Sequence, residues 1–210
     1  MMSIAITKFW SWFEVGNKAF INLSSPNLDG NEKVLLLDSI LNNLHQYCDK
    51  LFFEIGGSPG EDQELIITAD GDVDFFSQVE SLINNAPKIE GWVFTAFMQP
   101  RELDYIINFE DVEIKPHEVW FLPLDNKNAP KSIGLRICLP NYQLIKDNKW
   151  LQAAVYRVLD TILGEKAFSL DIDYVDIKSI PEGNLEEQGL MELKDLSAFV
   201  KWKKAKVASL

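Results

Sequence analysis

Cysteine is scarce in this sequence of 210 residues: only Cys48 and Cys138 are present. They lie far apart, and each belongs to an apolar pattern rather than to a spacing typical of metal ligands. This usage argues against a small fold held together by disulfides and against a paired-cysteine zinc site. We expect two reduced, buried thiols.

Long apolar runs are also missing. No stretch of the sequence reaches the roughly 20 consecutive apolar residues that a membrane-spanning helix requires. The N-terminus lacks the order of basic, apolar and small residues that marks a secretory signal. From these two absences, the expected location is the cytoplasm.

Basic charge is low. The chain holds 20 Lys and Arg against 32 Asp and Glu, which gives a formal net charge of -12 at pH 7. Such a chain repels a phosphate backbone, so nucleic-acid binding is not expected. One local exception surrounds Trp202, with Lys201, Lys203, Lys204 and Lys206. Cations suit the C-terminal end of a helix, so we interpret this cluster as a solvated helix end rather than a nucleic-acid patch.

Motifs of common enzyme classes are absent as well. The sequence contains neither a P-loop nor the glycine pattern of a Rossmann fold. It has two histidines, His45 and His117. His45 lies three residues before Cys48, but Cys48 belongs to an apolar stripe and no further ligand is suitably spaced. The sequence therefore offers no motif for nucleotide binding and no complete set of metal ligands around His45.

Apolar residues make up 47% of the chain, enough for one substantial core or two small ones. Residues 4–13 are rich in large apolar side chains, which predicts a helix docked on the core. Asp29 precedes a second helix, predicted over residues 31–48. Its apolar stripe follows spacings of three and four residues and consists of Val34, Leu37, Leu41, Leu44 and Cys48.

Strand signals follow. Runs at residues 51–55 and 64–69 flank a glycine-rich loop, 56–60, which predicts a hairpin. A helix follows that carries Phe75, Phe76, Val79, Leu82 and Ile83 and ends before Pro87. The next strand, 92–98, is apolar on both faces. This pattern is typical of a central strand covered on both sides, and we expect the strand to lie parallel to the one before the helix.

The second half of the chain repeats this order. Short runs at 105–109 and 118–122 precede a strand at 133–139. A helix bearing Leu151, Val155, Val158, Leu159 and Ile162 ends before Gly164, a suitable C-cap residue. Alternation then predicts a closing strand over 168–175, with four residues facing inward: Phe168, Leu170, Ile172 and Tyr174.

The order strand, strand, helix, strand therefore occurs twice and predicts an α+β fold with helices packed on sheet. The two units form either one larger mixed sheet or two similar layers. We expect an α+β domain over residues 1–178, either undivided or built from two pseudo-repeated units at about 31–98 and 105–178. Residues 179–210 are predicted to form an exposed linker and a C-terminal helix.

The most conspicuous polar cluster is Asp70, Asp72 and Asp74, at the turn from a strand into a helix. A calcium-binding loop counted from Asp70 would need glycine at its sixth position and glutamate at its twelfth, where Phe75 and Ser81 stand. A magnesium site at the end of the strand remains open. Acidic residues at a helix start also cap its free amides, and we favour that interpretation.

A second acidic group consists of Asp171, Asp173 and Asp176. Arg136 lies on the polar face of the preceding strand, so a cross-strand ion pair is expected. Glu54 lies between Phe53 and Ile55. A partly buried carboxylate is sometimes a general acid, but a single one without a partner is more often simply hydrogen-bonded.

Three segments together resemble an uncharacterised bacterial protein family: Glu64–Gly71 (ELIITADG), Ala86–Pro87 and Gly91–Phe97 (GWVFTAF). The resemblance implies a bacterial origin. Because the family has no known activity, it implies no substrate and no catalytic residue.

These observations favour a non-catalytic, cytoplasmic protein-binding module, such as an immunity-like or adaptor protein, whose acidic charge suits a basic partner. No cofactor is expected under this hypothesis. One alternative is a divalent-metal-dependent hydrolase that uses the Asp70–Asp74 turn. A second alternative is a structural homodimer joined through sheet edges or the aromatic N-terminal segment.

Overall fold

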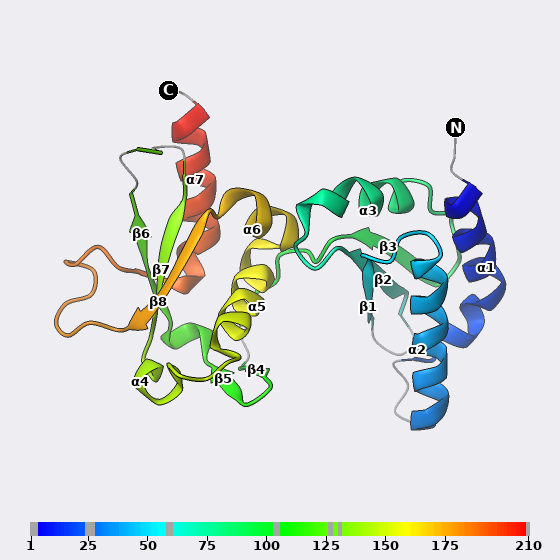
Figure 1. Ribbon diagram of the computed structural model, residues 1–210, viewed down its shortest axis with the longest axis horizontal. Coiled ribbons are helices and arrows are strands. Elements are labelled where there is room, and N and C mark those ends of the chain that lie inside the picture. The colour runs from blue at the N-terminus through cyan, green and yellow to red at the C-terminus, as the bar shows by residue number, and fades with distance from the viewer. Residues whose placement is uncertain are drawn as a thin grey trace. The chain divides into compact units, whose positions relative to one another are not determined.

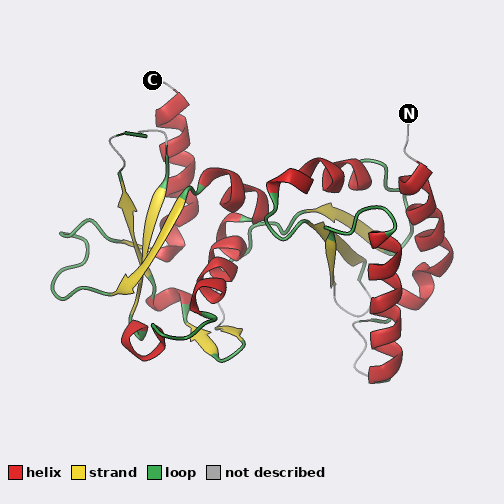
Figure 2. Cartoon of the chain, in the orientation of Figure 1, coloured by secondary structure: helices red, strands yellow, loops and turns green. Residues whose placement is uncertain are grey.

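Contacts divide the chain into two units, Met1–Met98 and Gln99–Leu210 (Figure 1). The computed structural model describes residues 4–23, 28–57, 61–102, 106–125, 128–129 and 132–208. Helices and strands are both abundant in each unit, so the predicted α+β class is confirmed (Figure 2). Residues 58–60 of the predicted hairpin loop and residues 105, 126–127 and 130–131 of the predicted second repeat lie outside the described residues.

The first unit begins with α1 (Ile4–Phe20). Ile6, Phe9, Trp10 and Phe13 recur at spacings that place them on one side of a helix, and all four are buried. The expected docking of this segment on the core is therefore confirmed. Trp12 of the same helix is only partly buried.

The second helix, α2 (Gly30–His45), starts where the Asp29 carboxylate accepts hydrogen bonds from the backbone N–H groups of Asn31 and Glu32. These bonds satisfy amides that have no partner within the helix. The predicted helix is confirmed, but it ends before Cys48. The predicted stripe is partly wrong, since Ile40 is fully buried whereas Val34 is 55% exposed. Residues 34–37 are all apolar and together surround the helix, so the apolar spacing did not determine which side of α2 faces the core.

Three strands form the sheet of the first unit, in the order β1 (Phe52–Gly56), β2 (Gln63–Thr68), β3 (Trp92–Ala96). β1 pairs with β2 antiparallel, and β2 pairs with β3 parallel. The 3-10 turn η1 (Val73–Phe75) and helix α3 (Phe76–Ile83) connect β2 to β3. The predicted hairpin and parallel strand are both confirmed.

The prediction that the third strand is central is wrong. β3 lies at the edge of the sheet, and its Val93 is 46% exposed. Phe97 belongs to the predicted strand 92–98, but it follows the end of β3 and has a φ of 64°. Its ring instead packs on Phe76 at a centroid distance of 4.6 Å. The turn after the strand therefore brings Phe97 into the core, and only one face of β3 needs a helical cover.

The core of this unit joins the sheet to all three helices. The register places Leu65 beside Phe94 on one face of the sheet. Phe13 of α1 meets Phe94 and Trp92 edge-on, with centroid distances of 5.6 and 5.0 Å. The indole Nε1 of Trp10 donates to the carbonyl oxygen of Leu82 at 2.9 Å, which ties α1 to the end of α3.

The second unit begins with a small hairpin, β4 (Ile107–Phe109) and β5 (Val112–Ile114), and the 3-10 turn η2 (Pro116–Glu118). Its main sheet has the order β8-β7-β6-β9 and consists of β6 (Trp120–Leu124), β7 (Gly134–Leu139), β8 (Tyr174–Ser179) and β9 (Met191–Glu192). β6 and β7 are antiparallel, and β7 and β8 are parallel. These strands repeat the connectivity of β1, β2 and β3. The two predicted strand-strand-helix-strand units are thus present, each with its own sheet.

The predicted closing strand over 168–175 is wrong in its position. Three helices separate β7 from β8: α4 (Tyr142–Ile145), α5 (Leu151–Leu163) and α6 (Glu165–Asp171). Phe168 and Ile172 pack on the core at a spacing of four residues, as a helix requires, whereas Leu170 and Tyr174 are exposed. The strand β8 starts only at Tyr174. The sequence alternates in polarity through α6, and this alternation concealed the helix.

The chain ends with the 3-10 turn η3 (Leu193–Asp195) and helix α7 (Leu196–Ala208). Leu193, Leu196 and Val200 are buried in the same core as Phe121 of β6, so α7 packs on the second unit.

In the segment before β9, the side-chain amide of Gln188 donates to the carbonyl oxygens of Glu182 and Asn184, at 2.7 and 3.2 Å. Among the described residues, no helix is both long and apolar enough to cross a membrane.

Candidate functional site

The turn after β2 contains the three aspartates that the sequence analysis named as a candidate metal site. Asp70 has a φ of 51° and Gly71 a φ of 80°, so the chain reverses through two left-handed residues. The backbone N–H of Asp70 donates to Thr68 Oγ1 at 2.9 Å, which stabilises the reversal. Asp70, Asp72 and Asp74 are all exposed.

Asp72 caps the helix that follows. Its carboxylate accepts a hydrogen bond from the backbone N–H of Asp74 at 3.2 Å and is the N-cap of η1. This contact is the one that the capping interpretation expects. The described part of the chain contains no group of three or more His, Cys, Asp or Glu residues that could hold a metal ion. A metal role for Asp70, Asp72 and Asp74 stays a prediction.

The second acidic group is dispersed over different partners. The Nε of Arg136 on β7 donates to the carboxylate of Asp176 on β8 at 2.8 Å. The predicted cross-strand ion pair is therefore present, but its acid is Asp176 rather than Asp171 or Asp173. Asp173 accepts a hydrogen bond from the backbone N–H of Ile133, and Asp171 pairs with Lys204 at 2.7 Å. The three carboxylates stabilise separate contacts rather than one site.

Electrostatics at Asp176 favour its charged form. Partial burial alone would raise the pKa of this carboxyl. Hydrogen bonds from Arg136 and Lys178, together with their positive charges, outweigh burial and hold its pKa below the usual range. The pair therefore joins two parallel strands of the second sheet.

The lysine cluster of α7 is partly neutralised. Lys203 donates to Asp125 at 2.8 Å, and this hydrogen bond lowers the pKa of the Asp125 carboxyl. The ammonium of Lys206 lies 5.0 Å from the centre of the Trp202 ring, at cation–π distance. Lys201, Lys204 and Lys206 are exposed, which fits the interpretation as a solvated helix end, whereas Lys203 is partly buried.

The remaining residues singled out in the sequence do not converge. His45 Nε2 lies 3.1 Å from the carbonyl oxygen of Leu51. Cys48 is half-buried and Cys138 is buried, and both are free thiols. Burial raises the pKa of the Cys138 thiol, while Arg136 opposes and Asp176 reinforces the effect. Glu54 is half-buried in β1.

An exposed apolar pair stands out on α2. Leu35 is 69% exposed and Val34 is 55% exposed. Glu32 and Asp38, three residues before and after Leu35, are exposed as well. Residues three or four apart are neighbours on a helix, so these four side chains form one surface. We call it the α2 surface.

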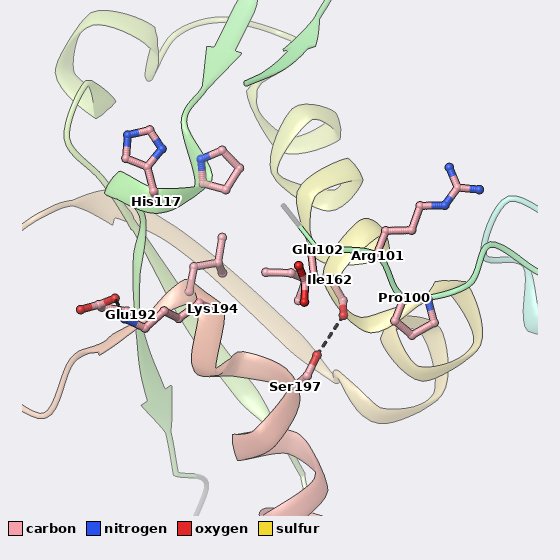
Figure 3. A pocket seen from close by; sticks show the side chains of 10 residues that line it. Pro100, Arg101, Glu102, His117, Ile162, Glu192, Lys194 and Ser197 are labelled. Atoms are coloured by element: carbon pink, nitrogen blue, oxygen red, sulfur yellow. Dashed lines mark hydrogen bonds and ion pairs between the residues drawn. The ribbon is translucent and has the colours of Figure 1, made fainter. Parts of the chain in front are cut away.

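A pocket of about 660 Å³ lies in the second unit (Figure 3). It is formed by the start of this unit, η2, the end of α5, β9, η3 and the start of α7. Its lining residues are Pro100, Arg101, Glu102, Pro116, His117, Ile162, Glu192, Leu193, Lys194 and Ser197. A pocket of this size with a few polar groups is suited to a small ligand.

Polar contacts organise this pocket. The hydroxyl of Ser197 donates to the carbonyl oxygen of Ile162 at 2.9 Å, the dashed contact in Figure 3. Lys194 forms an ion pair with Glu192, and the Glu192 carboxylate raises the pKa of Lys194. The backbone N–H of Arg101 donates to the carbonyl oxygen of Thr161 at 2.7 Å, which fixes the chain at one wall.

Sequence reasoning noticed His117 but missed the pocket. Its lining comes from four separate segments, and their proximity depends on how α5 and α7 pack on the sheet. The comparisons give no further guide, because no protein-family model, curated protein or solved structure matches the chain. The resemblance to a bacterial family therefore stays a prediction.

Proposed function

We propose that this chain is a non-catalytic module that binds a basic protein partner through the α2 surface. The observation that carries the proposal is the exposure of Leu35 and Val34 between the carboxylates of Glu32 and Asp38. Exposed apolar side chains supply binding energy when a partner covers them, and surrounding charges select the partner.

The charge of the first unit supports the same reading. Residues 1–98 contain 14 Asp and Glu against 5 Lys, a net charge of -9, out of the -12 of the whole chain. A concentrated negative potential raises the rate at which a basic protein arrives and orients its approach. The exposed turn at Asp70, Asp72 and Asp74 belongs to this unit and adds to the field.

The proposal includes a cytoplasmic setting. Cys48 and Cys138 are free thiols, and reduced thiols are usual in that compartment. An immunity-like or adaptor role would require a tight complex there. Burial of a leucine side chain contributes about 1.5–3 kcal/mol, so Leu35 alone would account for a large change in affinity.

Capture of the partner tests the proposal. Tagged protein is incubated with a lysate of its source cells, and bound proteins are identified by mass spectrometry. Replacing Leu35→Ser should remove the specific partner without unfolding the protein, because the side chain is exposed. Leu144→Ser is the matched control, since Leu144 is 87% exposed on α4 in the other unit.

Two results would count against the proposal. A partner that is retained equally by wild type and Leu35→Ser would place binding elsewhere. Self-association in light scattering that Leu35→Ser abolishes, with no partner captured, would replace it with the homodimer alternative.

A further inference from the structure

The pocket of the second unit combines apolar walls with one carboxylate that lacks an opposite charge. Pro100, Pro116, Ile162 and Leu193 supply the walls, and Glu102 supplies the carboxylate. Among the described residues, no hydrogen bond or ion pair reaches the Glu102 side chain. We propose that this pocket binds a primary alkylammonium group, with its ammonium on Glu102 and its methylene stem against the walls.

The cationic side chains of the pocket are already engaged or directed elsewhere. Lys194 is held by Glu192. The side chain of Arg101 leads away from the centre of the pocket, and the ring of His117 also points outward (Figure 3). His117 Nε2 lies 3.7 Å from the carboxylate of Glu118. Among the described lining residues, an anionic ligand would therefore find no available cation in the middle of the pocket, whereas a cation would find Glu102.

Further acceptors suit the three N–H donors of an ammonium group. The hydroxyl of Ser197 uses its proton on the carbonyl oxygen of Ile162, so its own oxygen lone pairs are available to accept. Both groups line the same pocket as Glu102. Hydrogen bonds between an ammonium and a carboxylate are roughly twice as strong as neutral ones, so Glu102 should dominate the binding.

The apolar walls explain why a simple metal cation is a poorer fit. Lysine-like groups bury a methylene stem along apolar surface while the charged end remains near water. Glu102 is exposed, so it lies where such a charged end would stay hydrated. The volume of about 660 Å³ also leaves room for a stem of several carbons. The ligand could be a free diamine or the lysyl side chain of a peptide, and both present the same chemistry.

Titration of the full, isotope-labelled chain tests the site by NMR. The probes are 1,5-diaminopentane and acetyl-Gly-Lys-Gly-amide, with pentanol and pentanoate as neutral and anionic controls. We expect saturable shifts at the backbone amides of Ile162, Leu193 and Ser197. Glu102→Gln should weaken binding about tenfold, which corresponds to about 1.4 kcal/mol. Glu182→Gln, an exposed carboxylate outside the pocket, should leave the affinity unchanged.

The two probe titrations distinguish the possible sources of the ammonium group. Binding of the diamine alone supports a free amine as ligand, and binding of both probes supports a lysyl side chain as well. The proposal is overturned if these amides do not shift, if Glu102→Gln binds as tightly as wild type, or if pentanoate binds better than the diamine. The site is independent of the α2 surface, so Leu35→Ser should bind the probes as wild type does.

Discussion

At the scale of single residues, the charge of Asp176 joins two strands of the main sheet of the second unit. Its carboxylate accepts from Arg136 across the parallel pair β7 and β8 and also lies 3.3 Å from Lys178. Because the pKa of Asp176 is lowered in the folded chain, the folded state binds its proton less tightly than the unfolded state does. Its contribution to stability is therefore present above its ordinary pKa and is lost as the pH falls through the lowered value.

Replacing Asp176→Asn should reduce the free energy of unfolding by about 1 kcal/mol at neutral pH. The difference from wild type should disappear in strong acid, where the wild-type carboxyl is protonated too. Urea unfolding across this pH range measures both quantities. Asp195→Asn, an exposed position, is the control. An equal difference at neutral and at acid pH would contradict the assigned role of charge.

Cys138 is predicted to be the less reactive of the two thiols. It is 2% exposed, and burial raises its pKa, so little thiolate is present to react. In the native protein, iodoacetamide should modify Cys48 first and Cys138 only slowly. In urea the two rates should become similar. Mass spectrometry of the labelled peptides follows the reaction, and equal native rates would show that Cys138 is more accessible than its burial indicates.

At the scale of elements, Asp72 at the start of η1 has two possible roles, helix cap and metal ligand, and substitutions distinguish them. If the carboxylate acts as a cap, Asp72→Ala should cost about 1 kcal/mol of stability, and Asp72→Asn should cost little because asparagine also caps helices. Thermal unfolding with and without Mg²⁺ measures both variants. A metal-dependent rise in melting temperature that is lost in Asp72→Asn would instead support the metal role.

The sequence predicted correctly those elements whose apolar pattern is compatible with only one kind of secondary structure. Residues 4–13 carry one apolar stripe and form a docked helix, and the glycine-rich loop between β1 and β2 indicated an antiparallel pair. The strand predicted over 168–175 is wrong before Tyr174 because Phe168 and Ile172 satisfy both a strand period and a helix period. Gly164, with a φ of 80°, ends α5 and allows α6 to begin at once, an effect that local alternation does not reveal.

The candidate sites were less accessible to sequence reasoning. The aspartates of the Asp70 turn were visible because they are neighbours in the chain. The exposure of Leu35 was not visible, because it lies within a run of four apolar residues on α2. The pocket depends on segments near residues 100, 117, 162 and 194, which only tertiary packing brings together.

The whole molecule contains two separate cores. Phe13 is fully buried in the core of the first unit, and Phe121 is fully buried in the core of the second. Phe13→Ala should lower the stability of the first unit by about 3–5 kcal/mol because it leaves a cavity among packed rings. Hydrogen exchange should then show lost protection in β1, β2 and β3, with protection retained in β6, β7 and β8. Equal loss in both sheets would mean that the two cores unfold as one.

Under the proposed function, the first unit binds a basic protein through its acidic charge and the α2 surface. The most direct test is the association rate constant with the captured partner, measured at low and high salt for wild type and for the double variant Glu32→Gln/Asp38→Asn. We predict that the wild-type rate falls strongly as salt increases, because exposed charges steer the encounter and salt screens them. The variant should associate more slowly at low salt and should approach the wild-type rate at high salt. A rate that is independent of salt, or equal for both proteins at low salt, would contradict the account.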